Sequence, residues 1–289
     1  RDESMQTGLL IIGSILSLLF IAQLFRGQGY EALVEGVDEK KYPLKELYVV
    51  GFAWSHGPPF SLRGAMGDRL KKQAALIYGP QYADYYANLQ WAMGITLVHL
   101  ISAVTCIYAA WQNSGTTFLI GMFIALLAGV YAVENMHNEL SKRTADCELE
   151  LPEVVSTMAI LVNSGMVLRD AWRMIGESSE GAIYKLMREA GENMQNGYSD
   201  ADAILLFGRA TDSPEIIKFT SALLQSMEKG GSELPLFLAK ESSELWSSKR
   251  QKTLQLGEKA SAKLLAPIML VFIGIIIIIM AAAFAGSLF

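Results

Sequence analysis

The chain has 289 residues, of which 24 are Lys or Arg and 29 are Asp or Glu, so that 18% are charged, and its mean hydropathy is +0.29. Soluble domains usually have about 25% charged residues. Residues 4–25, 85–133 and 264–289 contain no charged residue, so the other 192 carry all 53 charges. This distribution excludes a simple cytosolic enzyme, a disordered chain and a disulfide scaffold, and it indicates an integral membrane protein with large water-facing parts.

The first expected element is a membrane-spanning helix over residues 8–25, because about 20 apolar residues cross the hydrocarbon core. The stretch ends at Arg26. A cleaved signal peptide is the alternative, but the stretch is longer than a usual signal core and lacks an Ala-x-Ala exit. We therefore expect residues 1–25 to be an N-terminal transmembrane helix. The sequence begins with Arg1, which leaves open whether further residues precede it.

Residues 26–90 are expected to form a smaller cytoplasmic helical segment. Helices are predicted over 42–54 and 62–77, with a break between them at the sequence His-Gly-Pro-Pro, residues 56–59. Four tyrosines lie before the second span, and they predict interfacial anchoring, with a groove for a partner helix as the alternative. The segment has 8 basic and 7 acidic residues, so nothing in it indicates binding to nucleic acid.

Residues 91–133 are expected to form a transmembrane helical hairpin. A polar turn at residues 112–115 divides the uncharged stretch into spans over 91–111 and 115–133, the first bracketed by Trp91 and Trp111. His99 is the ionisable side chain near the middle of its span. An intramembrane histidine is a functional candidate. A neutral imidazole hydrogen-bonded to a neighbouring helix is the interpretation that we favour, because no carboxylate accompanies it in the spans.

Residues 134–263 are expected to form a cytoplasmic bundle of six helices. Gly165, Gly197 and the pair Gly230 and Gly231 each follow one predicted helix and precede another, as glycines that end helices do. Their spacing of 32 to 34 residues suggests repeated helical hairpins, although any six-helix bundle with short turns gives a similar spacing. The predicted helices cover residues 151–163, 168–175, 183–194, 199–206, 213–229 and 232–263, with a capping box opening the fourth and Pro at the first position of the fifth.

An acidic cluster precedes the first of these six helices and has two interpretations. It consists of Asp146, Glu148, Glu150 and Glu153. Carboxylates suit a helix N-terminus because the backbone dipole is positive there. The sharper alternative is a face that contacts a partner protein.

Residues 264–289 are the fourth expected span, the C-terminal transmembrane helix. Five basic residues precede it at positions 249, 250, 252, 259 and 263, and attraction to anionic lipid headgroups explains them. Of the 24 basic residues, 23 lie in the two segments between spans, and four spans place both segments on one side. The positive-inside rule makes that side the cytoplasm, with both termini outside.

Two stretches of the second segment resemble a known family. They are ELPEVVSTMAILVNSGMVLRDAWRMI from residue 150 and MEKGGSELPLFLAKESSELWSSKRQKTLQLGEKASAKLLAPIMLVFIGIIII from residue 227. They are similar to the F domain of type II secretion systems, and most similar to the C-type membrane platform protein of Tad/Flp pilus systems. The resemblance covers residues 151–284 well, residues 26–90 only loosely, and its turn positions include Gly165, Gly230, Gly231 and Pro267.

This resemblance implies a non-enzymatic inner-membrane platform protein that contacts a hexameric secretion ATPase, a second F-domain protein or another copy of itself, pilin subunits and the lipid bilayer. It implies no cofactor. Independently, the sequence lacks a phosphate-binding loop, a dinucleotide-binding motif and a paired-histidine metal motif. Glu134 and His137 have a spacing that suits a metal ion, but an interfacial polar cluster is the interpretation that we favour. A small-solute transporter or channel remains the alternative function, and a membrane enzyme comes third.

Overall fold

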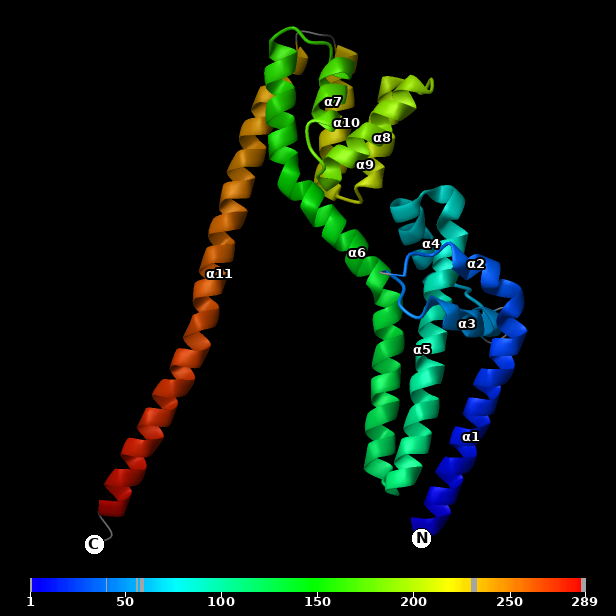
Figure 1. Ribbon diagram of the computed structural model, residues 1–289. Coiled ribbons are helices and arrows are strands. Elements are labelled where there is room, and N and C mark those ends of the chain that lie inside the picture. The colour runs from blue at the N-terminus through cyan, green and yellow to red at the C-terminus, as the bar shows by residue number, and fades with distance from the viewer. Residues whose placement is uncertain (1, 40, 56, 58–59, 230–232, 287–289) are drawn as a thin grey trace. The chain divides into compact units, whose positions relative to one another are not determined.

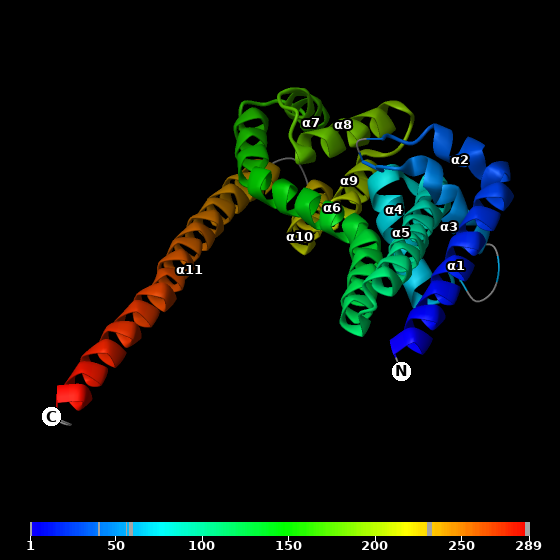
Figure 2. The same ribbon diagram turned by 60° about the horizontal axis from the view of Figure 1, so that its bottom comes forward.

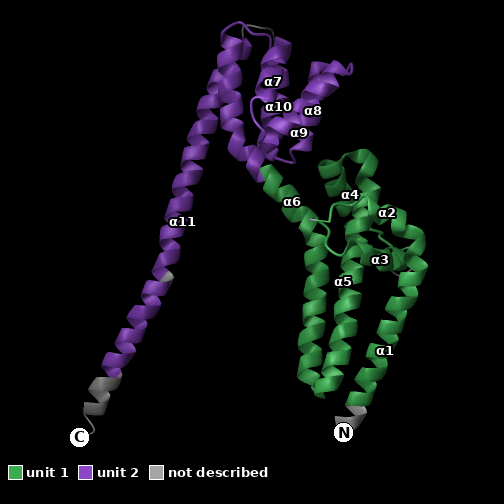
Figure 3. Ribbon diagram, viewed as in Figure 1, with its two compact units in different colours: residues 1–144 green, residues 145–289 purple. Residues whose placement is uncertain are grey.

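A computed structural model describes residues 2–39, 41–55, 57, 60–229 and 233–286. Across these residues the chain is helical and contains no strand (Figure 1). It divides into two compact units, residues 1–144 and residues 145–289 (Figure 3). The expected all-α fold class is therefore confirmed for the described part of the chain.

Four of the described helices are long and apolar enough to cross a membrane. They contain the four stretches predicted to be spans, up to residue 286, so the expected count of four is confirmed for the residues described. These helices are α1 (Asp2–Gly27), α5 (Ala83–Gln112), α6 (Gly115–Asn163) and α11 (Glu233–Gly286).

Unit 1 places α1, α5 and the first part of α6 side by side, as Figures 1 and 2 show from two directions. Shorter helices pack at one end of these three. They are α2 (Glu31–Glu35), α3 (Tyr48–Ser55), α4 (Ala65–Tyr78) and three single 3-10 turns, Gln28–Tyr30, Lys45–Leu47 and Pro80–Tyr82. Buried side chains from α2, α3, α5 and α6 form one core, and a second, smaller core joins α4 to α5 and α6.

A close backbone contact fixes α3 against α5. Gly51 lies on α3, and a Cβ atom there would overlap the carbonyl oxygen of Ala92 on α5. The Gly51 N–H donates a hydrogen bond of 3.1 Å to Oγ1 of Thr96, which is buried. Glycine permits this approach because it has no side chain. The helix therefore rests directly on the backbone of a candidate span.

The first helix expected between the first and second spans begins later in the structure than predicted. The sequence pattern predicted a helix over 42–54, but α3 begins at Tyr48. Leu44 has a left-handed backbone with φ of 61°, and the Tyr48 hydroxyl donates a hydrogen bond of 2.5 Å to the Pro43 carbonyl. Proline followed by a left-handed residue forms a turn that a continuing helix cannot contain. The second helix, predicted over 62–77, is α4 with a shift of one to three residues.

A polar cluster ties the chain before α3 to α4 and α6. Lys41 Nζ lies 2.6 Å from a carboxylate oxygen of Glu139 on α6 and 4.6 Å from the centre of the Tyr78 ring on α4. The Tyr78 hydroxyl lies 3.3 Å from that of Tyr42, which is buried. Burial raises the pKa of Tyr78 to about 12, so the phenol is neutral at physiological pH. Three segments of unit 1 are thus held together by one cation and two phenols.

Unit 2 is built around one apolar core. The core takes side chains from the second part of α6, the first part of α11 and four helices between them, α7 (Leu168–Glu177), α8 (Ala182–Gln195), α9 (Asp200–Ala210) and α10 (Pro214–Lys229). Trp172 on α7 is the largest of its fully buried side chains. Its indole N–H donates a hydrogen bond of 3.0 Å to the Met187 carbonyl on α8, and its ring meets Phe207 on α9 edge to face.

The two expected helix starts at polar residues agree with the structure. The Ser199 hydroxyl accepts a hydrogen bond of 3.0 Å from the backbone N–H of Asp202 at the start of α9. Pro214 is the first residue of α10. The missing N–H of proline costs nothing at this position, because the first N–H groups of a helix have no partner within the helix.

The start predicted for a helix at residue 151 is wrong. The structure has one helix, α6, from Gly115 to Asn163, with Pro152 inside it. Pro152 removes one backbone hydrogen bond. The helix continues because Cys147 and Leu151 before the proline and Val155 after it are buried in the same core, so packing outweighs that local loss.

Candidate functional site

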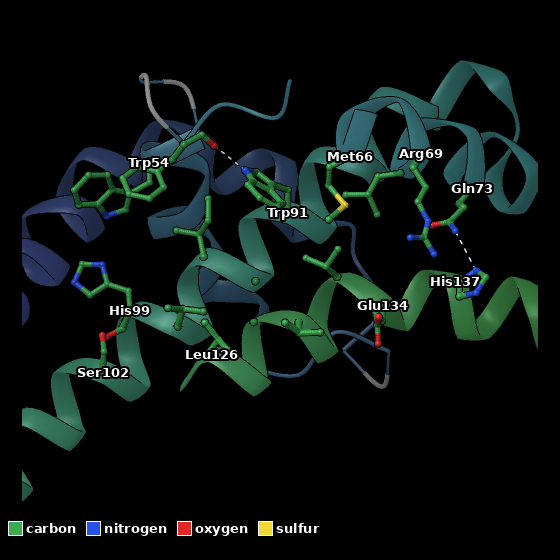
Figure 4. Close-up of a pocket in the computed structure, with 18 of the residues that line it drawn as sticks. Trp54, Met66, Arg69, Gln73, Trp91, His99, Ser102, Leu126, Glu134 and His137 are labelled. Atoms are coloured by element: carbon green, nitrogen blue, oxygen red, sulfur yellow. Dashed lines mark hydrogen bonds between the residues drawn. The ribbon is translucent and has the colours of Figure 1, made fainter. Parts of the chain in front are cut away.

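A cavity of about 590 Å³ lies within unit 1, between the candidate spans and the shorter helices. Binding pockets for small ligands usually have volumes of about 300–1,000 Å³. Side chains from α1, α3, α4, α5 and α6 line the cavity, and Figure 4 shows most of them. Because five separate helices contribute to its wall, from Leu16 on α1 to His137 on α6, no continuous motif could have revealed it.

The long wall of the cavity is apolar and comes from the candidate spans. It includes Leu16 and Leu19 on α1, Ile95 and Val98 on α5, and Leu126 and Val130 on α6. Two glycines line the same wall, Gly94 and Gly129, and a Cβ atom at Gly129 would overlap Val98. The glycines therefore let α5 and α6 approach closely beside the cavity.

His99 lies at one end of the cavity. Its Nε2 atom is 2.9 Å from the carbonyl oxygen of Leu16 on α1, so the ring donates a hydrogen bond to a neighbouring helix. Phe20 meets the ring edge to face at 5.4 Å, and the Trp54 ring lies 6.0 Å away. The Ser102 hydroxyl donates to the His99 carbonyl at 2.9 Å. The expected hydrogen bond between His99 and a neighbouring helix is confirmed, and aromatic packing holds the ring in place.

The other end of the cavity is polar. Arg69 and Gln73 lie one turn apart on α4, and Figure 4 shows them opposite Glu134 and His137 on α6. Gln73 Nε2 is 3.2 Å from Nδ1 of His137. Gln73 is buried, with an exposed fraction of 7%. Within the described part of the chain, neither Arg69 nor Glu134 forms an ion pair within 4.0 Å.

Aromatic side chains close the cavity on the side of α3. The Trp91 indole N–H donates a hydrogen bond of 2.7 Å to the Phe60 carbonyl, and the rings of Trp54 and Phe60 meet edge to face at 5.3 Å. All three residues line the cavity. Trp91 was expected as an interfacial aromatic, whereas Trp54, Arg69 and Gln73 were not singled out. The spacing of Met66, Arg69, Leu70 and Gln73 on one face of α4 is the signal that was present in the sequence.

The acidic cluster does not lie at the start of its own helix, which corrects the expectation of capping there. It lies within α6, and two of its members reach the starts of other helices in unit 2. Glu150 accepts a hydrogen bond of 3.0 Å from the Ile183 N–H at the start of α8. Glu148 accepts one of 2.7 Å from the Ser213 hydroxyl, which precedes α10. Asp146 is half-buried and Glu153 is exposed.

The turn residues named from the sequence fall in three different settings. Gly165 follows α6 with φ of 94°, and Gly197 follows α8 with φ of 97°, both in the left-handed region that favours glycine. Gly230 and Gly231 lie outside the described residues. Pro267 lies inside α11 and not at a turn, which corrects that expectation. Its flanks, Lys263–Leu265 and Ile268–Val271, are helical, and a proline is tolerated in such a long apolar helix.

Among the described residues, no three or more His, Cys, Asp or Glu side chains come together in a group that could hold a metal ion. Glu134 and His137, which have a spacing suited to a metal, both line the cavity wall, and His137 is engaged with Gln73. Both cysteines, Cys106 and Cys147, are buried, and no disulfide joins them.

A model of a known protein family matches part of the chain. The model of the family described as type II secretion system (T2SS), protein F, matches residues 154–285. The matched range begins in α6, ends in α11 and lies within unit 2. This match supports the resemblance of that segment to the F-domain family. No curated protein and no solved structure matches the chain.

Proposed function

We propose that the protein is an inner-membrane platform protein of a Tad/Flp-type pilus or a type II secretion apparatus. In this role it couples a cytoplasmic hexameric ATPase to the assembly of pilin subunits. The observation that carries the proposal is the protein F match over residues 154–285. The Tad/Flp assignment rests on the sequence resemblance alone, and it is the finer part of the proposal.

The helices of unit 2 support a mechanical role. Both α6 and α11 run without a break from an apolar stretch into the core of the unit. Lys252 on α11 pairs with Glu215 on α10 at 2.7 Å, and Lys249 donates to the Leu149 carbonyl on α6 at 2.8 Å. A force applied to this helical unit would therefore be transmitted to two candidate membrane-spanning helices, because α6 continues past Pro152 and α11 continues past Pro267.

The proposed topology places both water-facing segments in the cytoplasm and both termini outside. It rests on the distribution of Lys and Arg, 23 of which lie between the spans. The chain then carries residues 26–90 and the six-helix bundle of residues 134–263 on the side where ATP is available.

The direct test is co-purification of the full chain with a hexameric secretion ATPase from the same organism. We expect a stable complex in detergent. We also propose that Glu153, which is exposed on α6, contacts the ATPase, so Glu153→Lys should weaken the complex. Glu192→Lys makes the same charge change on an exposed residue of α8 and serves as the control. A chain that binds no ATPase under conditions that preserve assembled pili would contradict the proposal.

One observation favours the alternative, a small-solute transporter or channel. His99 and Ser102 line a cavity between candidate spans, and intramembrane polar residues often mark solute pathways. Reconstitution of the full chain in liposomes distinguishes the two functions. The platform proposal predicts no specific solute flux, and a saturable flux abolished by His99→Leu would favour transport.

A further inference from the structure

The position of the unit 1 cavity defines the kind of molecule that can reach it. Its apolar wall is formed by α1, α5 and α6, which are candidate spans, so a membrane surrounds this wall with hydrocarbon chains. Its polar end lies where α4 meets α6 at Glu134 and His137, directly after the uncharged stretch that ends at residue 133. The cavity thus begins among acyl chains and ends at the level where headgroups are expected.

The charges at the polar end have opposite signs and do not neutralise each other directly. Arg69 is exposed on α4 and Glu134 is exposed on α6, and both line the cavity. Neither forms an ion pair within 4.0 Å with any described residue. A ligand that presents a negative group to one and a positive group to the other would satisfy both. Guanidinium groups bind phosphate through directed hydrogen bonds, and carboxylates accept hydrogen bonds from ammonium groups.

We propose that the cavity binds a zwitterionic phospholipid with a primary ammonium headgroup. One acyl chain lies along Leu16, Ile95 and Leu126, the phosphate contacts Arg69, and the ammonium group contacts Glu134. This site is separate from the F-domain segment that carries the proposed function, because the cavity is lined only by residues of unit 1.

The volume of the cavity supports a lipid chain over a polypeptide helix. A membrane-spanning helix about 10 Å wide and about 30 Å long occupies roughly 2,400 Å³, several times the 590 Å³ of the cavity. A methylene group is close in size to a water molecule, which occupies about 30 Å³, so a chain of about 16 carbons fills roughly 480 Å³. The cavity therefore accommodates one acyl chain but not a whole helix.

Binding is measured by native mass spectrometry of the full chain in a lipid-free detergent, with phosphatidylethanolamine or phosphatidylglycerol added in increasing amounts. We expect tighter binding of phosphatidylethanolamine, because phosphatidylglycerol lacks the ammonium group. Arg69→Gln should weaken the binding of both lipids about fivefold, since one basic residue near an anionic headgroup contributes about 1 kcal/mol. Glu134→Gln should weaken the binding of phosphatidylethanolamine alone and remove the preference.

Lys72→Gln is the matched control for Arg69→Gln. Lys72 is exposed on the same helix and is not among the residues that line the cavity. Lys72→Gln should leave lipid binding unchanged if the site is specific. Thermal unfolding of each variant checks that the fold is retained. Equal binding of the two lipids in the unaltered chain, or equal effects of Lys72→Gln and Arg69→Gln, would overturn the proposal, because both indicate a nonspecific lipid layer.

A photo-crosslinking amino acid at position 98 tests the occupant in the membrane itself. Val98 is exposed on α5 and lines the apolar wall. After illumination of native membranes we expect an adduct with the mass of a phospholipid. An adduct with a polypeptide in place of a lipid would overturn the proposal and assign the cavity to a protein partner.

Discussion

At the scale of single residues, two carboxylates of α6 serve helices other than their own. The first N–H groups of a helix lack partners within the helix, so a carboxylate brought there by the fold satisfies them and also suits the positive end of the dipole. Glu150 does so for α8, and Glu148 reaches α10 through the hydroxyl of Ser213. A Cβ atom at Gly181 would overlap the Glu150 carboxylate, so glycine at this position leaves room for the cap.

Replacement of Glu150 by Ala should therefore destabilise unit 2. The change leaves the buried Ile183 backbone N–H without its partner, and loss of such a cap costs about 1 kcal/mol. Glu153→Ala removes a carboxylate from the exposed surface of the same helix and should change stability by less than about 0.5 kcal/mol. Thermal unfolding of the full chain in detergent measures both. Equal effects would show that the Glu150 hydrogen bond contributes nothing.

Glu241 gives unit 2 a stability that depends on pH. Burial on α11 raises the pKa of its carboxyl group above the usual value, and the nearby Glu244 carboxylate raises it further. An acid whose pKa is higher in the folded state favours folding at low pH, and this contribution is lost as the pH rises through the folded-state pKa.

Glu241→Gln should accordingly raise the stability at pH 7 relative to the unaltered chain, and this gain should vanish below about pH 4. We expect less than about 1 kcal/mol because the side chain is partly exposed. Unfolding temperatures measured across this pH range test the sign. Glu192→Gln, on an exposed position of α8, is the control and should show no such trend. A gain that persists at low pH would exclude titration of Glu241 as its cause.

At the scale of helices, the sequence predicts which helices exist better than it predicts the residues at which they begin and end. The apolar periodicity and the turn signals of residues 163–231 lead to α7, α8, α9 and α10, whose observed ends differ from the predicted ones by at most four residues. The continuity of α6 through Pro152 could not be predicted, because it depends on burial of Cys147, Leu151 and Val155 against helices that follow much later. The cavity escaped prediction for the same reason, since Arg69 and Glu134 line the same cavity only through the packing of α4 on α6.

Two glycines on neighbouring helices of unit 2 should respond oppositely to the same substitution. A Cβ atom at Gly208 on α9 would overlap Oγ1 of Thr220, which is buried on α10, so Gly208→Ala should destabilise the unit by about 1–3 kcal/mol. Gly191 lies inside α8 with nothing within 4 Å of the added atom. Gly191→Ala should stabilise by about 0.5–1 kcal/mol, because alanine loses less backbone entropy on folding into a helix.

The two variants are compared by thermal unfolding of the full chain. Trp172 is buried in the core of unit 2, so its fluorescence reports on this unit when the other four tryptophans, at positions 54, 91, 111 and 246, are replaced by Phe in both variants and in the reference chain. Stabilisation by Gly208→Ala would show that α9 and α10 are packed less closely than described, and destabilisation by Gly191→Ala would show that a partner covers that face of α8.

At the scale of the whole molecule, the separation of charge from apolar sequence determines how the chain can lie in a membrane. The four candidate spans are separated by a long charged segment, a short turn and a second long charged segment. Each span reverses the side on which the next segment lies. If all four candidate spans cross the membrane, residues 26–90 and 134–263 share one side, whichever side the basic residues select, and the turn near Asn113 lies on the other.

Single cysteines test this arrangement. The native Cys106 and Cys147 are buried and should react slowly with a maleimide that does not cross membranes. Thr116→Cys, in the exposed start of α6, should be labelled in vesicles whose outer surface corresponds to that of the cell. Lys72→Cys on α4 and Glu192→Cys on α8, also exposed, should be labelled only after detergent is added. The inverse pattern would retain four spans but contradict the positive-inside assignment, whereas opposite behaviour of the Lys72 and Glu192 variants would require an odd number of spans between them.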